Sequence, residues 1–362
     1  MSRVAEKNSR DYRRILIIKP SSLGDIVHAL PVLAGLRAAY PRAHIAWLVG
    51  STFLPLIEGH PLLDEVIPFD RRRYGRILKD PGVLLAFLRF LGGLRRRRFD
   101  LAVDLQGLGR SGFLAWASGA AERVGFSDAR ELAGLFYTRR VRRPAGAEHA
   151  VDKNLAVLAA LGLPAGPAQF DLAVKREEHQ ATRMLLARAL GHVPGAFTAV
   201  VPAARWESKL WPPARWAELI DRLHTDGRGP CVLLGSPADR ELANQVRAAC
   251  RTEVVSLVGD TTLRELVALL DLADLVICHD SGPMHIAAAL KKPLVALFGP
   301  TNPRRTGPYG SSARVIAQPL PCVPCYRRYC PLKHHACLAE LPAATVLAEV
   351  RRLRPAPVSA IP

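Results

Sequence analysis

The sequence predicts an α/β protein with two domains, each built on a parallel β-sheet. Its 362 residues exceed what one hydrophobic core comfortably serves, and 49% of them are hydrophobic, which is enough to fill two cores. Runs of consecutive apolar residues, such as 15–18, are typical of parallel strands covered on both faces. Because these runs alternate with helix-like segments, we expect parallel strands joined by right-handed crossovers.

The first half of the chain begins with a βαβ pattern. The predicted strands are 15–19, 44–49 and 100–105, and the predicted helices are 25–39, 83–98, a segment after Arg110, 152–161 and 177–190. A proline–glycine break at 164–167 and a strand-like FDLAV at 170–174 come before the last of these helices. Such a break predicts a domain boundary near 165–178.

The second half alternates more regularly. The predicted strands are 197–201, 231–234, 254–258, 275–279 and 294–298, and the predicted helices are 213–226, 238–250, 262–271, 283–290 and 343–353. This regular alternation predicts a second parallel sheet.

The segment 275–290, LVICHDSGPMHIAAAL, predicts a phosphate-binding turn. An apolar strand ends at Asp280-Ser281-Gly282, and Pro283 then opens a helix, where its missing N–H costs nothing. Such a turn gathers free N–H groups and the positive end of a helix dipole, which together bind phosphate. The alternative is an ordinary turn whose Asp280 or Ser281 caps the helix.

A second turn lies in 15–30, ILIIKPSSLGDIVHAL. It places Asp25 beyond the carboxyl end of a buried strand and at the start of a helix. Ligands of open α/β sheets bind beyond the carboxyl ends of strands, so this carboxylate is placed for chemistry. The alternative is an acid that merely favours the first helical turn.

Several motifs in order carry a family resemblance: KPSSLGDIVHALP at 19–31, KLWP at 209–212, HDSGPMHIAAAL at 279–290 and FGPT at 298–301. Over roughly residues 13–353 the chain resembles glycosyltransferase family 9, the bacterial ADP-heptose:lipopolysaccharide heptosyltransferases. The resemblance implies the GT-B fold, in which two Rossmann-like domains face a central cleft. It implies an acceptor-binding domain at 13–174, a nucleotide-sugar-binding domain at 175–353, and a last helix that packs back on the first domain.

The resemblance also implies roles for single residues. Glycosyl transfer needs a base for the acceptor hydroxyl and groups that hold charge on the departing diphosphate. Asp25 would be the base, and Lys209 with the helix start at 280–283 would hold the leaving ADP, so no catalytic metal is expected. The expected acceptor-side residues are Ser21, Ser22, Gly24, His28, Asp104, Gln106 and Arg130, and the expected donor-side residues are Asp280, Ser281, Gly282, His285, Gly235, Asp239 and Thr301.

At two positions the match to the family is less direct. Arg130 resembles a family arginine near the acidic acceptor sugar, and it is equally well explained as a helix-surface arginine. Ala203-Ala204 departs from the family, since some heptosyltransferases carry threonines there that contact the nucleotide phosphates. Backbone N–H groups would have to serve instead.

The predicted activity is inverting transfer of L-glycero-D-manno-heptose from ADP-heptose to Kdo or the first heptose of the lipopolysaccharide inner core. An NAD-dependent Rossmann oxidoreductase is an alternative, because GLGRSG at 107–112 matches the dinucleotide fingerprint. That fingerprint also needs an acid at the end of the next strand, and neither Glu122 nor Asp128 ends a convincing strand. A protein heptosyltransferase and a non-catalytic nucleotide-sugar-binding module are further alternatives.

The formal net charge of +18 predicts an anionic partner. Arg71–Arg73 with Arg76, and then Arg95–Arg98, flank the apolar segment 82–94. Such a pattern is typical of a surface drawn to anionic headgroups, and it equally suits a phosphorylated glycolipid or a merely solvated face. No nucleic-acid partner is expected, since no zinc finger, helix-turn-helix or aromatic-interleaved basic motif is present.

The expected location of the protein in the cell follows from its N-terminal residues and its apolar runs. The first dozen residues are charged and contain no apolar signal region, and the longest apolar run, 83–94, is too short to span a bilayer. We therefore expect a cytoplasmic protein, peripheral to the cytoplasmic face of the inner membrane.

Four of the seven cysteines fall within 16 residues, beside His334 and His335: Cys322, Cys325, Cys330 and Cys337. In a cytoplasmic chain this cluster favours a structural zinc or iron ion, because four thiolates close a tetrahedral site and disulfides are disfavoured. The competing interpretation is a loop with reduced thiols that helps to recognise substrate. The remaining cysteines are expected to be core residues: Cys231, Cys250 and Cys278.

Overall fold

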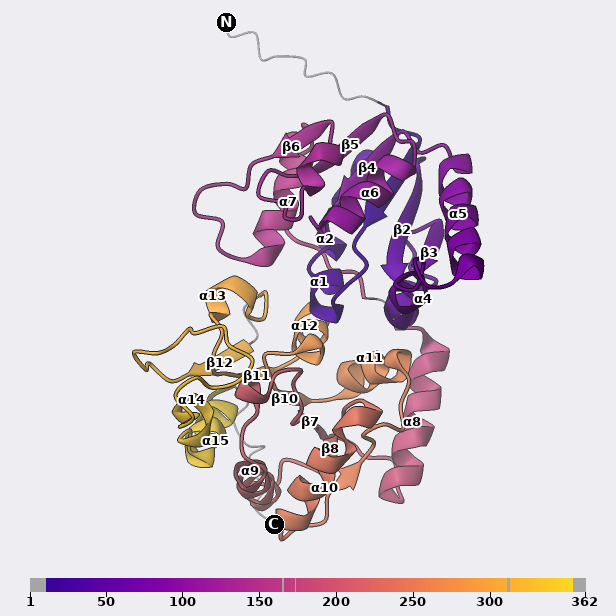
Figure 1. Cartoon of the computed structure of the whole chain (residues 1–362). Coiled ribbons are helices and arrows are strands. Elements are labelled where there is room, and N and C mark those ends of the chain that lie inside the picture. The colour runs from indigo at the N-terminus through magenta and orange to yellow at the C-terminus, as the bar shows by residue number, and fades with distance from the viewer. Residues whose placement is uncertain (1–10, 165, 173, 311–312, 354–362) are drawn as a thin grey trace, which may run out of the picture. The chain divides into compact units, whose positions relative to one another are not determined.

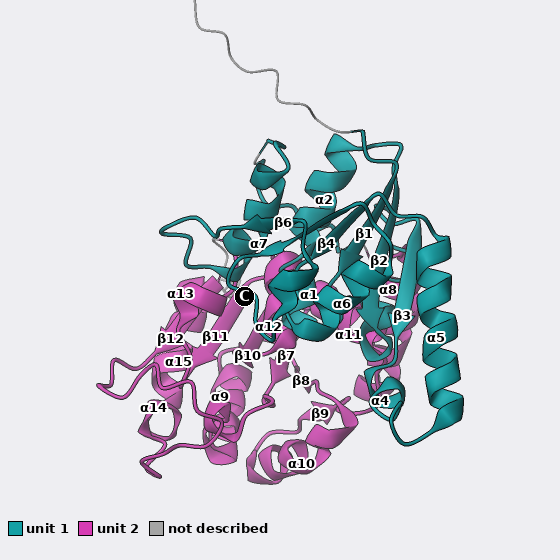
Figure 2. Ribbon diagram, turned by 45° about the horizontal axis from the view of Figure 1, so that its top comes forward, with its two compact units in different colours: residues 1–173 teal, residues 174–362 magenta. Residues whose placement is uncertain are grey.

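The computed structural model describes residues 11–164, 166–172, 174–310 and 313–353 (Figure 1). The chain divides into two compact units, unit 1 (residues 1–173) and unit 2 (residues 174–362), shown in teal and magenta in Figure 2. Each unit contains one six-stranded sheet, and every strand pairing in both sheets is parallel. The predicted α/β class with two parallel sheets is therefore confirmed.

Unit 1 has the strand order β3-β2-β1-β4-β5-β6. Its strands are β1 (Arg14–Ile18), β2 (His44–Gly50), β3 (Glu65–Phe69), β4 (Leu101–Asp104), β5 (Glu122–Phe126) and β6 (Arg139–Val141). Its helices are α1 (Leu23–Val27), α2 (Leu30–Ala39), α3 (Leu54–Ile57), α4 (Arg71–Tyr74), α5 (Pro81–Arg96), α6 (Gly109–Ala117) and α7 (Ala150–Ala160), with 3-10 turns η1 (Ser51–Phe53) and η2 (Ala133–Phe136). Strand β1 pairs with both β2 and β4, and residues 15–18 are fully buried, as the apolar run predicts.

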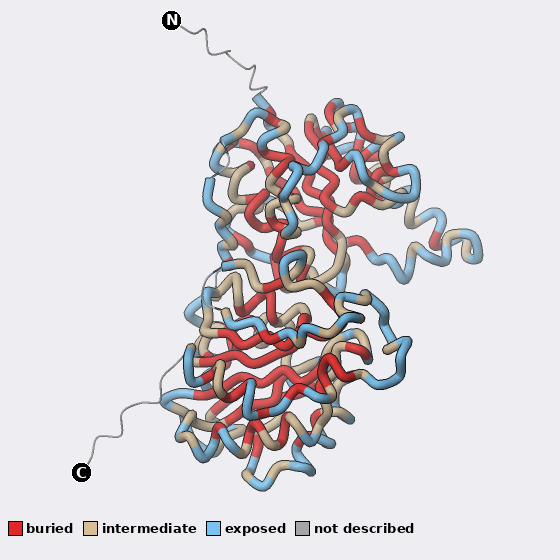
Figure 3. The backbone as a smooth tube through the Cα atoms, turned by 90° about the vertical axis from the view of Figure 1, so that its left-hand side faces the viewer, coloured by how far each residue is buried: buried red, intermediate tan, exposed pale blue. Residues whose placement is uncertain are grey.

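Unit 2 repeats this arrangement in the order β12-β11-β10-β7-β8-β9. Its strands are β7 (Thr198–Val201), β8 (Cys231–Leu233), β9 (Val255–Ser256), β10 (Leu275–His279), β11 (Leu294–Phe298) and β12 (Ala313–Ala317). Its helices are α8 (Arg176–Leu190), α9 (Pro213–Thr225), α10 (Arg240–Ala249), α11 (Leu263–Leu272), α12 (Gly282–Ala289), α13 (Pro303–Thr306), α14 (Ala336–Ala339) and α15 (Ala343–Leu353), with 3-10 turns η3 (Glu207–Lys209) and η4 (Pro237–Asp239). In Figure 3 the buried residues, in red, run through the interior of each unit, and exposed residues, in pale blue, lie at its surface.

Each sheet has one point where the strand order changes direction. In unit 1 this point lies between β1 and β4, and in unit 2 it lies between β7 and β10. Open α/β sheets bind ligands at such a point, beyond the carboxyl ends of the strands. Residues 19–25, 104–106 and 280–282 lie at the ends of these strands or in the turns and helix starts that follow them, so the fold brings the predicted residues to the expected ends of both sheets.

Two predicted features are wrong. The helix expected at 25–39 is two helices, separated at His28–Ala29. The strand-like segment 170–174 forms no strand in its described residues, because Asp171 has a positive φ of 25°. Helix α15 packs within unit 2. Its apolar residues Val346, Leu347 and Val350 lie in the unit 2 core, where α15 packs on α9, β11 and β12.

Candidate active site

The turn after β1 holds Asp25 in the first turn of α1. The backbone N–H and the Oγ of Ser22 both donate to Asp25 Oδ2, at 2.8 and 2.7 Å. The Nζ of Lys19 lies 4.0 Å from Asp25 Oδ1. The carboxylate is therefore fixed from two sides, while 46% of its side-chain surface remains open to solvent.

Lys19 is a residue of this cluster that the sequence analysis did not assign to the site. It is buried, and its Nζ donates to the carbonyl of Leu105 at 2.9 Å, which ties the turn after β1 to the turn after β4. Burial lowers the pKa of Lys19, and the charges of Asp25 and Asp104 oppose that shift. The sequence did contain a signal for this role, because Lys19 directly follows four apolar residues of a buried strand. A lysine buried at such a position is rarely left unpaired.

The surroundings keep the Asp25 carboxylate ionised. Burial by itself would raise the pKa of Asp25. The Lys19 ammonium, the two Ser22 hydrogen bonds and the His28 charge outweigh burial and lower the pKa below its usual value. An ionised carboxylate that still reaches solvent is the state that a general base needs.

The other predicted residues near Asp25 belong to the same helix start. Ser21 is half-buried in the turn, Gly24 is buried in α1, and His28 is buried at the break between α1 and α2. The His28 ring lies 5.3 Å from the ring of His149, in an edge-on contact. His149 caps α7 by accepting from the N–H of Val151 at 3.1 Å, so α7 brings an unpredicted histidine to this cluster.

At the end of β4, Asp104 and Gln106 behave differently. The buried Asp104 carboxylate accepts hydrogen bonds from the N–H groups of Gln106 and Gly107 and from the Tyr137 hydroxyl, at 2.8, 3.1 and 2.6 Å. Burial raises the pKa of Asp104 despite these hydrogen bonds. Asp104 thus anchors the turn, whereas Gln106 Oε1 has no hydrogen-bond partner among the described residues.

Arg130 is exposed on the segment that follows β5. Its backbone N–H donates to the carbonyl of Gly107 at 2.9 Å, which holds this segment beside the turn after β4. Within the described ranges its guanidinium makes no hydrogen bond or ion pair with the protein. The side chain is free to meet an anionic group.

The glycine motif at 107–112 serves packing within the protein. A Cβ on Gly109 would lie 2.6 Å from the Glu131 carbonyl oxygen, and one on Gly112 would lie 2.9 Å from the Ala133 carbonyl oxygen. The chain itself therefore occupies the space against the start of α6, where a dinucleotide pyrophosphate would have to approach. The prediction that no convincing strand precedes Asp128 is wrong, because β5 ends just before it. The Asp128 carboxylate pairs with Arg143 at 3.1 Å, so it is engaged within the protein.

In unit 2, Lys209 forms an ion pair with the buried Asp280. Lys209 Nζ donates to Asp280 Oδ2 at 2.6 Å and to the Asp280 carbonyl at 3.2 Å. The hydroxyl of Thr301 donates to the same Oδ2 at 2.6 Å. The Lys209 ammonium also lies 4.8 Å from the centre of the Trp206 ring. Asp280 and Thr301 thus fix the position of the Lys209 ammonium.

The start of α12 lies directly beside this pair in sequence. Ser281 is the N-cap residue, Gly282 is the first helical residue, and the buried Ser281 Oγ has no hydrogen-bond partner in the described part of the chain. His285 is buried one turn further into α12. An unpartnered hydroxyl and the free N–H groups of a helix start provide donors for an anion.

His279, the last residue of β10, supports the Lys209 segment. Its Nε2 accepts from the backbone N–H of Trp211 at 2.9 Å, and burial together with the Lys209 charge lowers its pKa to about 3. The imidazole is therefore neutral, with its proton on Nδ1. This contact fixes the chain two residues beyond Lys209.

Gly235 and Asp239 lie after β8. The Asp239 carboxylate accepts from the N–H and the Oγ of Ser236, at 2.8 and 2.6 Å, and so caps η4. A Cβ on Gly235 would lie 3.2 Å from Asp239 Oδ2, so glycine leaves room for this cap. Gly235 and Asp239 thus stabilise the start of η4, and they are not among the contacts of Lys209 or Asp280.

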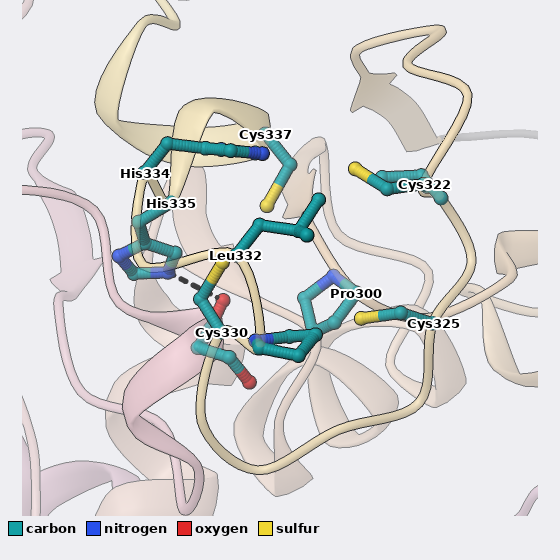
Figure 4. A pocket seen from close by; sticks show the side chains of 11 residues that line it. Pro300, Cys322, Cys325, Cys330, Leu332, His334, His335 and Cys337 are labelled. Atoms are coloured by element: carbon teal, nitrogen blue, oxygen red, sulfur yellow. Dashed lines mark hydrogen bonds between the residues drawn. The ribbon is translucent and has the colours of Figure 1, made fainter.

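The four clustered cysteines line one small cavity of about 20 Å³ (Figure 4). Pro300 and Leu332 also line it, and in the described part of the chain no three His, Cys, Asp or Glu side chains are placed to hold a metal ion. Burial, with the nearby thiols, raises the pKa of Cys337 to about 11. The thiols thus share a cavity without forming a metal site as they stand.

The cysteine segment also braces the chain next to Lys209. The Ser208 N–H and Oγ donate to the carbonyls of Arg328 and Arg327, at 3.1 and 2.6 Å, and His335 Nε2 lies 2.8 Å from the Ser208 carbonyl oxygen. Ser208 precedes Lys209 directly. The position of Lys209 therefore depends on the fold of residues 322–337.

The remaining cysteines are core residues or lie at the edge of the core. Cys231 and Cys278 are buried, and Cys250 packs against the same unit 2 core. Burial raises the pKa of Cys231 to about 12 and that of Cys250 to about 11. In the described ranges no helix is both long and apolar enough to cross a membrane.

Comparison with known proteins gives consistent matches. Residues 87–336 match the family model described as glycosyltransferase family 9 (heptosyltransferase). The chain is 34% identical over 322 residues to lipopolysaccharide heptosyltransferase 1 of Pseudomonas aeruginosa, a match that covers 88% of this chain and 87% of that protein.

Solved structures agree with the sequence matches. A family 9 glycosyl transferase from Veillonella parvula matches with a TM-score of 0.82 and 25% identity, over 95% of this chain and 98% of that chain. The Escherichia coli heptosyltransferase WaaC with ADP matches with a TM-score of 0.76 and 28% identity, over 94% and 99%. With the two sheets described above, these likenesses confirm the predicted GT-B fold.

Proposed function

This chain belongs to glycosyltransferase family 9, and we propose that it transfers L-glycero-D-manno-heptose from ADP-heptose to the inner core of lipopolysaccharide, at Kdo or the first heptose. It is a glycosyltransferase by family. The proposed donor is supported by the structural likeness to E. coli WaaC, which was solved with ADP. The proposed acceptor is supported by the likeness to the Pseudomonas protein, a lipopolysaccharide heptosyltransferase. The oxidoreductase alternative is not favoured.

The observation that carries the mechanism is the ionised Asp25 carboxylate at the point where the strand order of the unit 1 sheet changes direction. In the proposed step, Asp25 takes the proton of the acceptor hydroxyl while that oxygen bonds to the anomeric carbon of heptose. The bond from the anomeric carbon to the diphosphate breaks on the opposite face, and ADP leaves with the bonding electrons. The reaction passes through an oxocarbenium-like state and inverts the anomeric configuration.

On the donor side, Lys209 and the start of α12 would hold the charge that develops on the departing ADP. Free N–H groups, the unpartnered Ser281 hydroxyl and the Lys209 ammonium supply donors that are oriented before the reaction. Asp280 and Thr301 act by positioning Lys209. These groups do the work that a divalent metal does in other glycosyltransferases, so the proposed step requires none.

The two domains then have separate tasks. We assign acceptor binding to the N-terminal domain, with Gln106 and Arg130 as the side chains that have no partner in the described protein and remain available to an acidic sugar. We assign nucleotide-sugar binding to the C-terminal domain. The proposed site of action is the cytoplasmic face of the inner membrane, where the enzyme would be peripheral.

We also propose that the four clustered cysteines hold a structural zinc or iron ion. They line one cavity, and an ion there would require the thiols to converge from their present positions. Since this segment braces Ser208, the ion would steady the chain before Lys209. Elemental analysis of protein purified without chelator should find about one zinc or iron ion per chain. Sub-stoichiometric amounts of both metals would contradict this proposal.

The activity proposal is tested with ligands and acceptors in parallel. ADP should raise the melting temperature more than UDP, GDP or NAD, because a ligand that binds only the folded state stabilises it by mass action. With ADP-heptose, mass spectrometry should detect one added heptose on a Kdo-terminated or a heptose-terminated lipid A acceptor. A response to NAD alone, or heptose added only to protein, would overturn the proposal.

A further inference from the structure

Helix α5 presents apolar side chains on its outer face as well as its inner face. Val83 and Leu94 are buried, and Phe87 and Phe90 pack against the core of unit 1. On the outer face Leu84, Leu85 and Leu88 are 43, 49 and 54% exposed. A helix on the surface of a globular protein normally has polar residues there, so this second apolar face needs an explanation.

A row of aromatic rings also runs from the inner face of α5 to α6, where it ends at an exposed tryptophan. The rings of Phe87 and Phe113 are 6.4 Å apart, and those of Phe113 and Trp116 are 5.7 Å apart. Trp116 is 52% exposed. A half-exposed tryptophan is typical of a boundary between an apolar and a wet phase, because its ring is apolar and its N–H is polar.

The same region carries a large positive charge. Residues 70–98 contain ten basic and two acidic side chains, so they hold +8 of the formal +18 of the chain. Both acids cap helices: Asp70 accepts from the Arg73 N–H, and Asp80 accepts from the Gly82 and Val83 N–H groups. Of the ten basic side chains, Arg97 pairs with Glu65. The other nine are exposed and have no ion-pair partner among the described residues: Arg71, Arg72, Arg73, Arg76, Lys79, Arg89, Arg95, Arg96 and Arg98.

Helices α4, α5 and α6 are labelled in Figure 1. We propose that the surface formed by α4, α5 and Trp116 of α6, the docking surface, binds an anionic lipid bilayer. The leucines and Trp116 enter the headgroup boundary, and the unpaired arginines attract anionic lipid. A second copy of the chain fits poorly, because a symmetric contact would bring two surfaces of charge +8 together. A nucleic acid would use the arginines but leave the leucines in water.

The inference deepens the peripheral location proposed above and rests on it. It does not depend on which sugar is transferred. Vesicle binding is therefore measured separately from transfer to a water-soluble, de-acylated acceptor.

The experiment is co-sedimentation of the full-length protein with vesicles of phosphatidylcholine alone or mixed with phosphatidylglycerol. One variant carries Leu84→Ser, Leu85→Ser and Leu88→Ser, and another carries Arg71→Gln, Arg72→Gln and Arg73→Gln. The matched control carries Arg183→Gln and Met184→Ser, two exposed positions on α8 of unit 2. Because all these side chains point outward, melting temperatures should stay close to wild type.

Wild type and control should bind the anionic vesicles and bind neutral ones weakly, with affinity that falls as salt rises. The arginine variant should partition roughly 100-fold less well, at about a factor of five for each arginine. Both variants should keep wild-type turnover on the soluble acceptor. Unchanged binding in both variants, equal loss in the control, or self-association that the leucine variant abolishes would overturn the inference.

Discussion

Replacing Lys209 with methionine separates its structural contribution from its proposed contact with the donor. Lys209 Nζ lies 2.6 Å from Asp280 Oδ2, and the Asp280 side chain is only 6% exposed. The substitution leaves a buried carboxylate without its cation, which costs about 3–5 kcal/mol. Thr301 still donates a hydrogen bond at 2.6 Å, so we expect the lower end, about 3 kcal/mol. That loss corresponds to a fall in melting temperature of about 6–12 °C.

The double variant Lys209→Met/Asp280→Asn removes both charges and leaves no unpaired ion. It should therefore recover most of the lost stability. It should not recover ADP binding. The lost charge-assisted hydrogen bond to diphosphate is worth about 1.5–3 kcal/mol, so ADP affinity should fall roughly 10- to 100-fold in both variants.

Differential scanning fluorimetry gives the melting temperatures, and titration calorimetry gives the ADP affinities. Lys291→Met is the matched control, because it removes an exposed lysine just beyond the opposite end of α12. Wild-type ADP affinity in both Lys209 variants would refute the donor contact. A double variant as unstable as the single one would refute the account of the buried pair.

Three further predictions concern pH and stability. Lys19→Met removes a charge that lowers the pKa of Asp25, so the acid limb of the kcat/KM profile should move to higher pH; an unmoved limb would contradict this. Tyr137→Phe removes a 2.6 Å hydrogen bond to the buried Asp104 and should cost about 1–3 kcal/mol, measured by urea unfolding. His279 has a folded pKa of about 3, below its unfolded value, so its contribution to stability is complete above pH 6.5. Below pH 6.5 that contribution should fall by about 1.4 kcal/mol per pH unit, and His279→Gln should flatten the dependence.

The parts of the fold that the sequence predicts have strong local signals. Long apolar strands at the centre of each sheet, such as 15–18 and 275–279, are buried on both faces and therefore read as continuous apolar runs. The start of α1 has a local cap, in which Asp25 accepts from Ser22, and the start of α12 has the small residues and the early proline that such a turn needs. These local signals were sufficient to locate the turns that hold the candidate site.

The missed elements lack such signals. Strand β6 has three residues, and two of them are arginines, so no apolar run marks it. Strand β12 is an edge strand with an exposed arginine in it. Short edge strands are set by pairing with a neighbour, which is a tertiary effect that local sequence does not contain.

The side-chain network of the site was predicted only in part, because it joins distant positions. Lys209 and Asp280 were both expected at the donor site, but their pairing spans 71 residues, and the Thr301 hydrogen bond spans a further 21. Lys19 was overlooked because its hydrogen-bond partner, the carbonyl of Leu105, becomes a neighbour only when β1 and β4 pair.

The most direct measurement of the central claim compares wild type with Asp25→Asn for heptose transfer from ADP-heptose to a Kdo-terminated acceptor. Product mass and ADP release are followed together, and ADP affinity is measured for both proteins. We predict one ADP released per heptose added by wild type. In Asp25→Asn the rate should fall by about 10²- to 10⁴-fold with unchanged ADP affinity, because a general base has been removed. Equal rates in the two proteins, or no transfer by wild type to this acceptor or to its heptose-terminated counterpart, would contradict the account.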